Sequence, residues 1–270
     1  MEATCLNCNT EIVQNFCANC GQKKYKRIDR KYIWDEVQYS TVHMNKGFFY
    51  SLKNILINPG KTARTFIDGN RVNHYKPIAL AFILSGISAF IAYKLIGMGE
   101  MTAKVNAMQS NDATQLKLMK SFNDFIQTYI SLFTLALLPF FALLSRWSFK
   151  SFKNNFYEHV VMNAYILSYS TLISILVIYP LLYLFKDNEA VSMTLVVLPM
   201  LSFFIILPYF YKNFYHEYSL KKILSRVLLY FVLLFASFAV IAIMLAVFGF
   251  LFAYFNPEAV KHLVPKPPAA

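Results

Sequence analysis

The sequence predicts an all-α membrane protein, in which a five-span transmembrane helix bundle follows a zinc-ribbon-like cysteine knuckle and juxtamembrane interfacial helices. Composition supports the membrane assignment, because 57% of the 270 residues are hydrophobic and only 15% are charged, whereas soluble domains carry about 25% charged residues. The cysteines support a separate N-terminal unit. All 4 of them lie within residues 1–20, so they belong together.

Residues 1–22 form this first unit. Its cysteines follow the pattern Cys5-x2-Cys8-x8-Cys17-x2-Cys20. Each Cys-x2-Cys pair can direct two thiolates to one metal ion, and four thiolates complete the closed shell of structural zinc. No apolar leader precedes them, so we expect a reducing cytosol, which favours metal over disulfides. Gly21, and Asn9 in the corresponding position, suit the tight turns. The pattern therefore predicts one structural zinc ion with no open position for catalysis.

The second unit, residues 23–76, begins with a basic segment. Its basic residues are Lys23, Lys24, Lys26, Arg27, Arg30 and Lys31. Beside a membrane, each such residue attracts anionic lipid by about 1 kcal/mol, and the segment could also contact a partner protein. Zinc knuckles with basic flanks sometimes bind nucleic acid. We do not expect this of a segment tethered beside a bilayer, and we predict lipid or partner contact.

Short helices are expected in the rest of this unit. Tyr32–Val42 can form one, and Lys46–Ile57 has apolar residues at helical spacing. Asn58 before a proline predicts an N-cap, and Gly69 predicts the end of that helix. We interpret these segments as interfacial helices along the cytoplasmic leaflet. The residues assigned to them are Phe48, Phe49, Leu52, Pro59 and Gly60.

The third unit, residues 77–255, contains five apolar runs, and a bilayer is crossed by a helix of about 20 residues. The runs are Pro77–Met98, Phe125–Ser145, Val160–Phe185, Val191–Tyr211 and Val227–Phe255. The polar segment Gly99–Asp124 can be helical or loose, and residues 256–270 form an external tail. The side that holds the N-terminus carries 19 Lys and Arg against 6 opposite. The positive-inside rule therefore places the N-terminus in the cytoplasm and the C-terminus outside.

The predicted spans are poor in ionisable groups. They contain no Asp, Glu, Arg or His, and Lys94 lies near a span end where it can snorkel. Ion-coupled transporters and intramembrane enzymes generally depend on such groups, so both classes are disfavoured. Asn163 can hydrogen-bond across helices. Small residues that allow close helix packing recur on the fifth span at Ala242, Ala246, Gly249 and Ala253.

The cysteine pairs, the stretch LKNILINPGKT from Leu52 to Thr62 and the segment DGNR from Asp68 to Arg71 resemble a known family. It is a bacterial family of uncharacterised membrane proteins, a domain of unknown function with an N-terminal zinc-ribbon-like segment. The resemblance implies the same architecture and a multi-pass location in the bacterial cytoplasmic (inner) membrane. It implies no reaction and no catalytic residue.

These features favour a non-enzymatic accessory or scaffold subunit, whose knuckle and interfacial helices dock another membrane protein or a second copy of the chain. The alternative is a channel or transporter for a small or lipid-like substrate, built around spans that contain prolines. A third class is an enzyme that acts at the cytoplasmic face through His74, His159 or His216. It has less support, because none of these histidines belongs to a metalloprotease motif.

Overall fold

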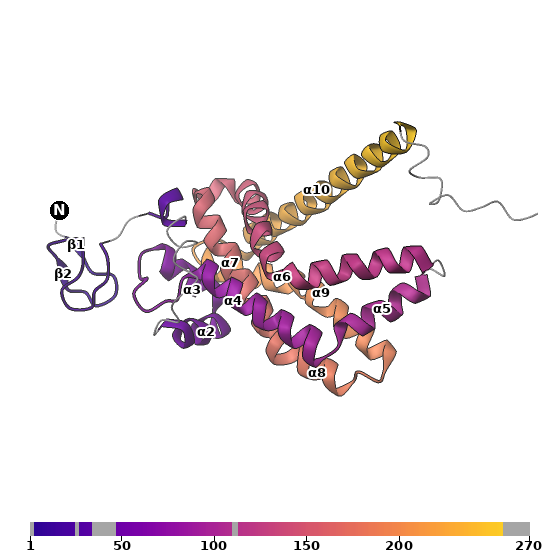
Figure 1. The fold of residues 1–270 in the computed structure, drawn as a ribbon. Coiled ribbons are helices and arrows are strands. Elements are labelled where there is room, and N and C mark those ends of the chain that lie inside the picture. Colours follow the sequence, from indigo (N-terminus) through magenta and orange to yellow (C-terminus); the bar gives the residue numbers. More distant parts are fainter. Residues whose placement is uncertain (1–2, 25–26, 34–46, 110–112, 256–270) are drawn as a thin grey trace, which may run out of the picture.

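The computed structural model describes residues 3–24, 27–33, 47–109 and 113–255 (Figure 1). In the N-terminal knuckle, β1 (Ala3–Thr4) pairs antiparallel with β2 (Glu11–Ile12), with Ala3 opposite Ile12. The described chain after residue 46 is mainly helical. The predicted fold class is confirmed, because five helical segments are long and apolar enough to cross a membrane.

The five spans follow one another along the chain. They are α4 (Pro77–Phe90) with the π-helical η1 (Ile91–Leu95), α6 (Ala113–Ser148), α7 (Phe156–Ile173) with the π-helical η3 (Ser174–Ile178) and α8 (Tyr179–Leu184), α9 (Glu189–Phe214), and α10 (Leu220–Phe255). Two further described elements connect the spans. α5 (Met98–Gln109) occupies the predicted polar segment, and the 3-10 turn η2 (Lys150–Phe152) links α6 to α7.

Four spans are longer than the sequence predicted: α6, the span that begins with α7, α9 and α10. α6 begins at Ala113 and α10 at Leu220, because hydropathy marks only the apolar part of a helix and the backbone pattern continues into polar flanks. α7 begins at Phe156 because a capping box fixes its start. The Asn155 side chain accepts from the Glu158 amide at 2.8 Å, and the Glu158 carboxylate accepts from the Asn155 amide at 2.9 Å.

Within the described residues 47–76, two helices precede the first span, α2 (Gly47–Ile57) and α3 (Pro59–Ile67). The predicted limits of α3 are confirmed: the Asn58 side chain accepts from the Lys61 amide at 2.9 Å, and Gly69 follows the C-cap with φ of 118°. The helix predicted over Tyr32–Val42 lies mostly outside the described residues, of which 30–33 are helical.

The residues of α2 and α3 that the sequence assigned to interfacial helices are mostly covered by protein. Phe48, Pro59 and Gly60 are buried and Leu52 is partly buried, so of the five assigned residues only Phe49 is exposed, at 74%. The reason is that an amphipathic helix can cover protein as well as lipid. Here α3 packs on α7 and α9.

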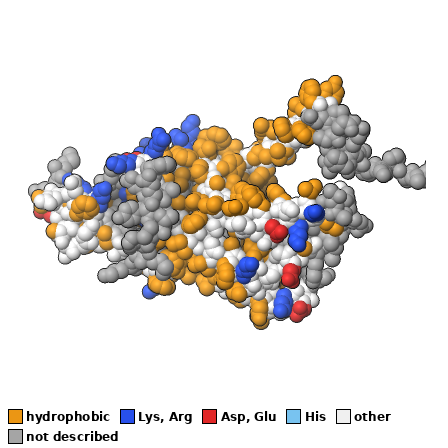
Figure 2. All heavy atoms as spheres, in the orientation of Figure 1, with side chains coloured by type: hydrophobic (Ala, Val, Ile, Leu, Met, Phe, Trp, Pro, Cys, Tyr) orange, Lys and Arg blue, Asp and Glu red, His pale blue; other side chains and the backbone are white. Residues whose placement is uncertain are grey.

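The knuckle and the outer part of α10 lie at opposite ends of the molecule, and α10 projects away from the other helices (Figure 1). The buried side chains of α10 are Ile223, Val227 and Tyr230, all near its start. The main core is therefore at the knuckle end of the bundle. Figure 2 shows hydrophobic side chains over the spans, basic side chains near the knuckle, and further basic side chains mixed with acidic ones toward the opposite end.

Candidate metal centre

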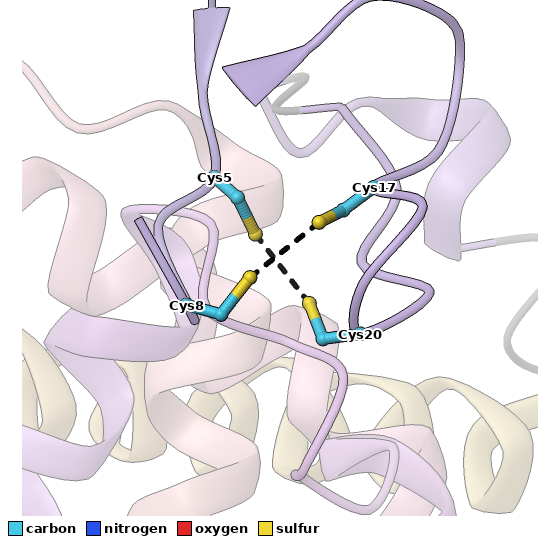
Figure 3. Close-up of side chains that lie close together, drawn as sticks. All are labelled: Cys5, Cys8, Cys17 and Cys20. Carbon is cyan, nitrogen blue, oxygen red and sulfur yellow. Dashed lines mark hydrogen bonds between the residues drawn. The ribbon is translucent and has the colours of Figure 1, made fainter. Parts of the chain in front are cut away.

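The four cysteines converge on one point (Figure 3). Their sulfur atoms all lie within 4.8 Å of one another. The Cys5 and Cys20 sulfurs are 3.5 Å apart, as are those of Cys8 and Cys17. Four sulfurs placed tetrahedrally about 2.3 Å from one zinc ion would be about 3.8 Å apart. The donor set and its spacing therefore fit a single metal ion held by four thiolates.

Two equivalent turns position the sulfurs. In each, the residue after the second cysteine donates its amide hydrogen to the carbonyl of the first: Asn9 to Cys5 at 2.9 Å, and Gly21 to Cys17 at 2.9 Å. The donors have left-handed backbones, with φ of 58° at Asn9 and 73° at Gly21. These are the two positions at which the sequence predicted a need for backbone freedom.

The surroundings affect the thiols differently. Burial raises the pKa of Cys5 to about 11. Hydrogen bonding with the Thr10 hydroxyl lowers the pKa of Cys8 to about 6, and bonding with Asn7 lowers the pKa of Cys20. A metal ion binds cysteine as thiolate. Its binding at this site would therefore displace protons, chiefly from the more basic thiols.

The knuckle is attached to the bundle by side-chain hydrogen bonds. Gln22, which is 4% exposed, donates to the Gly69 carbonyl and accepts from the Val72 amide at 2.8 Å. Asn73 donates to the side chain of Asn7 at 2.9 Å. Gly69, Val72 and Asn73 all lie in the loop between α3 and α4. These bonds fix the knuckle against that loop.

The predicted basic surface is only partly free to contact lipid or a partner. Lys23, Lys24, Arg30 and Lys31 are exposed, whereas Lys26 lies outside the described residues. Arg27 has a partner within the chain. Its Nε donates to Glu158 Oε1 at 2.6 Å and its Nη2 to Glu158 Oε2 at 3.1 Å. Sequence reasoning missed this pair because its members are 131 residues apart.

The candidate histidines have separate sets of partners. His74 packs against the rings of Tyr50 and Phe66, and exposed His216 lies beside Glu217. Among these described contacts, His74 and His216 have no partner in common.

His159 is fully buried, although its sequence position suggested a span boundary. Its Nδ1 lies 3.1 Å from Ser145 Oγ, and Asn163 also donates to that oxygen, at 2.9 Å. The predicted bond from Asn163 to another helix is thus confirmed. The burial of His159 was missed, although the capping pattern from Asn155 to Glu158 could have indicated that α7 begins before it.

The fold and the site together define a multi-pass helical membrane protein with a cysteine cluster able to hold a metal ion. Residues 45–89 match a family described as "Protein of unknown function (DUF3667)". The match covers α2, α3 and nearly all of α4, and agrees with the resemblance to an uncharacterised family. No curated protein matches the chain. No solved structure matches it either.

Proposed function

We propose that the chain is a non-enzymatic accessory or scaffold subunit of a membrane complex, and that its knuckle docks a partner protein. One observation carries this proposal. Leu6, Val13 and Phe16 are 52%, 84% and 57% exposed on a 22-residue unit whose own interior is formed by its cysteines and Ile12. Large apolar side chains on a small soluble unit are suited to burial against another protein.

We infer that the metal ion is zinc and that its role is structural. Tetrahedral four-thiolate sites are typical of zinc, and such a shell has no open position for substrate or water. A unit of this size cannot bury a sufficient core, so metal binding would supply its folding free energy. This supports a binding module rather than an active site.

The attachment of the knuckle to the helix bundle also supports a docking role. Gln22 and Asn7 hold the knuckle on the loop between α3 and α4. Because the knuckle is already ordered, binding of a partner would cost little conformational entropy. We place this face in the cytoplasm of a bacterial cell, at its cytoplasmic membrane, as the charge distribution and the family resemblance predict. The partner would be a second membrane protein or another copy of the chain.

The proposal is tested by site-specific photo-crosslinking in cells. A photoreactive residue at Val13 should give one discrete adduct, because this side chain is the most exposed of the three. The same residue at Lys117, which is exposed in α6 away from the knuckle, is the control and should not give that adduct. Cys17→Ser with Cys20→Ser should abolish the Val13 adduct. Absence of any adduct at Leu6, Val13 and Phe16 would refute docking through the knuckle.

A further inference from the structure

A second group of basic residues lies where α6 ends and α10 begins, next to the basic segment after the knuckle, whose Arg27 donates to the Lys153 carbonyl at 2.9 Å. Its members are Arg146, Lys150, Lys153, Lys221, Lys222 and Arg226. Reciprocal contacts join the two helices: the Ser148 hydroxyl donates to the Arg226 carbonyl, and the Arg226 guanidinium donates to the Ser148 carbonyl at 3.5 Å. Lys222 Nζ lies 5.2 Å from the ring centroid of Phe152. The loop after α6 and the first turns of α10 therefore present one surface.

The positive charge of this surface is not neutralised by acidic side chains. Within the described part of the chain, none of the six residues forms an ion pair. Nearby acids are engaged elsewhere, Glu158 by Arg27 and Glu217 by Arg64 at 3.3 Å. Figure 2 shows basic side chains gathered along the edge between the knuckle and α10. The surface therefore favours an anion.

Uncovered apolar side chains continue from the basic surface along α10. Lys221, Leu224, Leu228 and Val232 recur at spacings of three and four residues, which places them on one face of the helix. The three apolar members are 45%, 66% and 55% exposed. On α6, Trp147 is 58% exposed beside Arg146, as is typical of aromatic residues at the membrane interface. A soluble anion would use the charges but leave this apolar face uncovered.

We propose that this surface binds an anionic phospholipid. The phosphate lies among the basic side chains of the α6–α7 loop and the start of α10, and an acyl chain covers the apolar face of α10. The charge complementarity and the adjoining apolar face together select a lipid rather than free phosphate or nucleic acid. This site does not depend on the metal centre or on a docked protein.

Trp147 provides a direct fluorescent probe. The chain has 2 tryptophans, so in the Trp34→Phe variant Trp147 is the sole tryptophan. We would reconstitute this variant in phosphatidylcholine nanodiscs containing about 20 mol% of brominated phosphatidylglycerol or brominated phosphatidylcholine, since anionic lipid is drawn to basic surfaces. Bromine quenches tryptophan on contact. The proposal predicts about twofold stronger quenching by the anionic lipid.

Lys150→Gln, Lys153→Gln and Lys222→Gln together should make quenching by the two lipids equal. Lys117→Gln, Lys120→Gln and Lys186→Gln remove the same charge at the other end of the spans and should leave the preference unchanged. Circular dichroism of both triple variants checks that they fold. Equal quenching of the Trp34→Phe protein by the two lipids would overturn the proposal. So would loss of the preference on adding soluble glycerophosphate, which would indicate a site for the headgroup alone.

Discussion

The guanidinium of Arg27 forms two hydrogen bonds to the carboxylate of Glu158, at 2.6 and 3.1 Å. Glu158 is 3% exposed and also accepts from the amide that begins α7. The same guanidinium donates to the Lys153 carbonyl at 2.9 Å. One side chain of the segment after the knuckle thus joins that segment to the start of the third span.

Replacement of this arginine should destabilise the protein. Arg27→Gln leaves the buried Glu158 carboxylate without its cation, and the loss of one charged hydrogen-bond partner costs about 1–3 kcal/mol. Thermal unfolding in detergent should show a lower midpoint. Arg30→Gln, at an exposed position in the same segment, is the control. Adding Glu158→Gln to Arg27→Gln should recover part of the loss, and a purely additive double variant would argue against a direct pair.

Removal of the Gln22 amide should release the knuckle from the bundle. Gln22→Ala deletes bonds to Gly69 and Val72, each with a net contribution of about 1 kcal/mol. Limited proteolysis between the knuckle and α2 should become roughly tenfold faster, while the metal content stays the same. Gln14→Ala, at an exposed knuckle position, should have no effect. Unchanged cleavage of Gln22→Ala would show that these bonds do not hold the knuckle.

A methyl group at Gly60 should separate α3 from α9. Its Cβ would collide with the Phe210 carbonyl and would lie 2.8 Å from Asn213 Cβ and 2.9 Å from the Phe214 amide nitrogen. Such overpacking costs about 1–3 kcal/mol, so Gly60→Ala should lower the unfolding midpoint. Gly249→Ala in α10 is the matched control, because it makes the same substitution in a helix where the added methyl group meets open space. It should be neutral or slightly stabilising, and equal losses in both variants would contradict the close contact.

Burial of His74 should make stability depend on pH. Desolvation lowers the pKa of His74 to about 4, from an ordinary value of 6.5. The unfolded chain therefore binds this proton first, and the contribution of neutral His74 to stability is lost as the pH falls from about 6.5 to 4. His74→Phe keeps a ring beside Phe66 and should reduce the acid dependence of the unfolding midpoint. His216→Phe, at an exposed site, should preserve it.

The number of spans and the local start signals were predictable because they depend on neighbouring residues. Continuous apolar runs identified the five spans, and Asn58 followed by proline identified the start of α3. The convergence of the four cysteines and the left-handed backbones of Asn9 and Gly21 were predictable for the same reason, because they follow from the spacing of nearby residues. These features are set by hydropathy and by short-range backbone chemistry.

The tertiary partners were not predictable in this way. The spacing of Phe48 and Leu52 identifies an amphipathic helix but does not say whether protein or lipid covers its apolar face. The pair formed by Arg27 and Glu158 depends on how the spans are arranged in space. His159 appeared to lie at a boundary because hydropathy does not show where a helix with a polar start begins.

Metal binding by the four cysteines of the knuckle is tested most directly by metal analysis of the purified protein. Four convergent thiolates predict about one zinc ion per chain. Cys17→Ser with Cys20→Ser should reduce this to near zero, while circular dichroism shows that the helices persist. Absence of zinc from protein purified without chelators, or an unchanged zinc content in the double variant, would contradict the account.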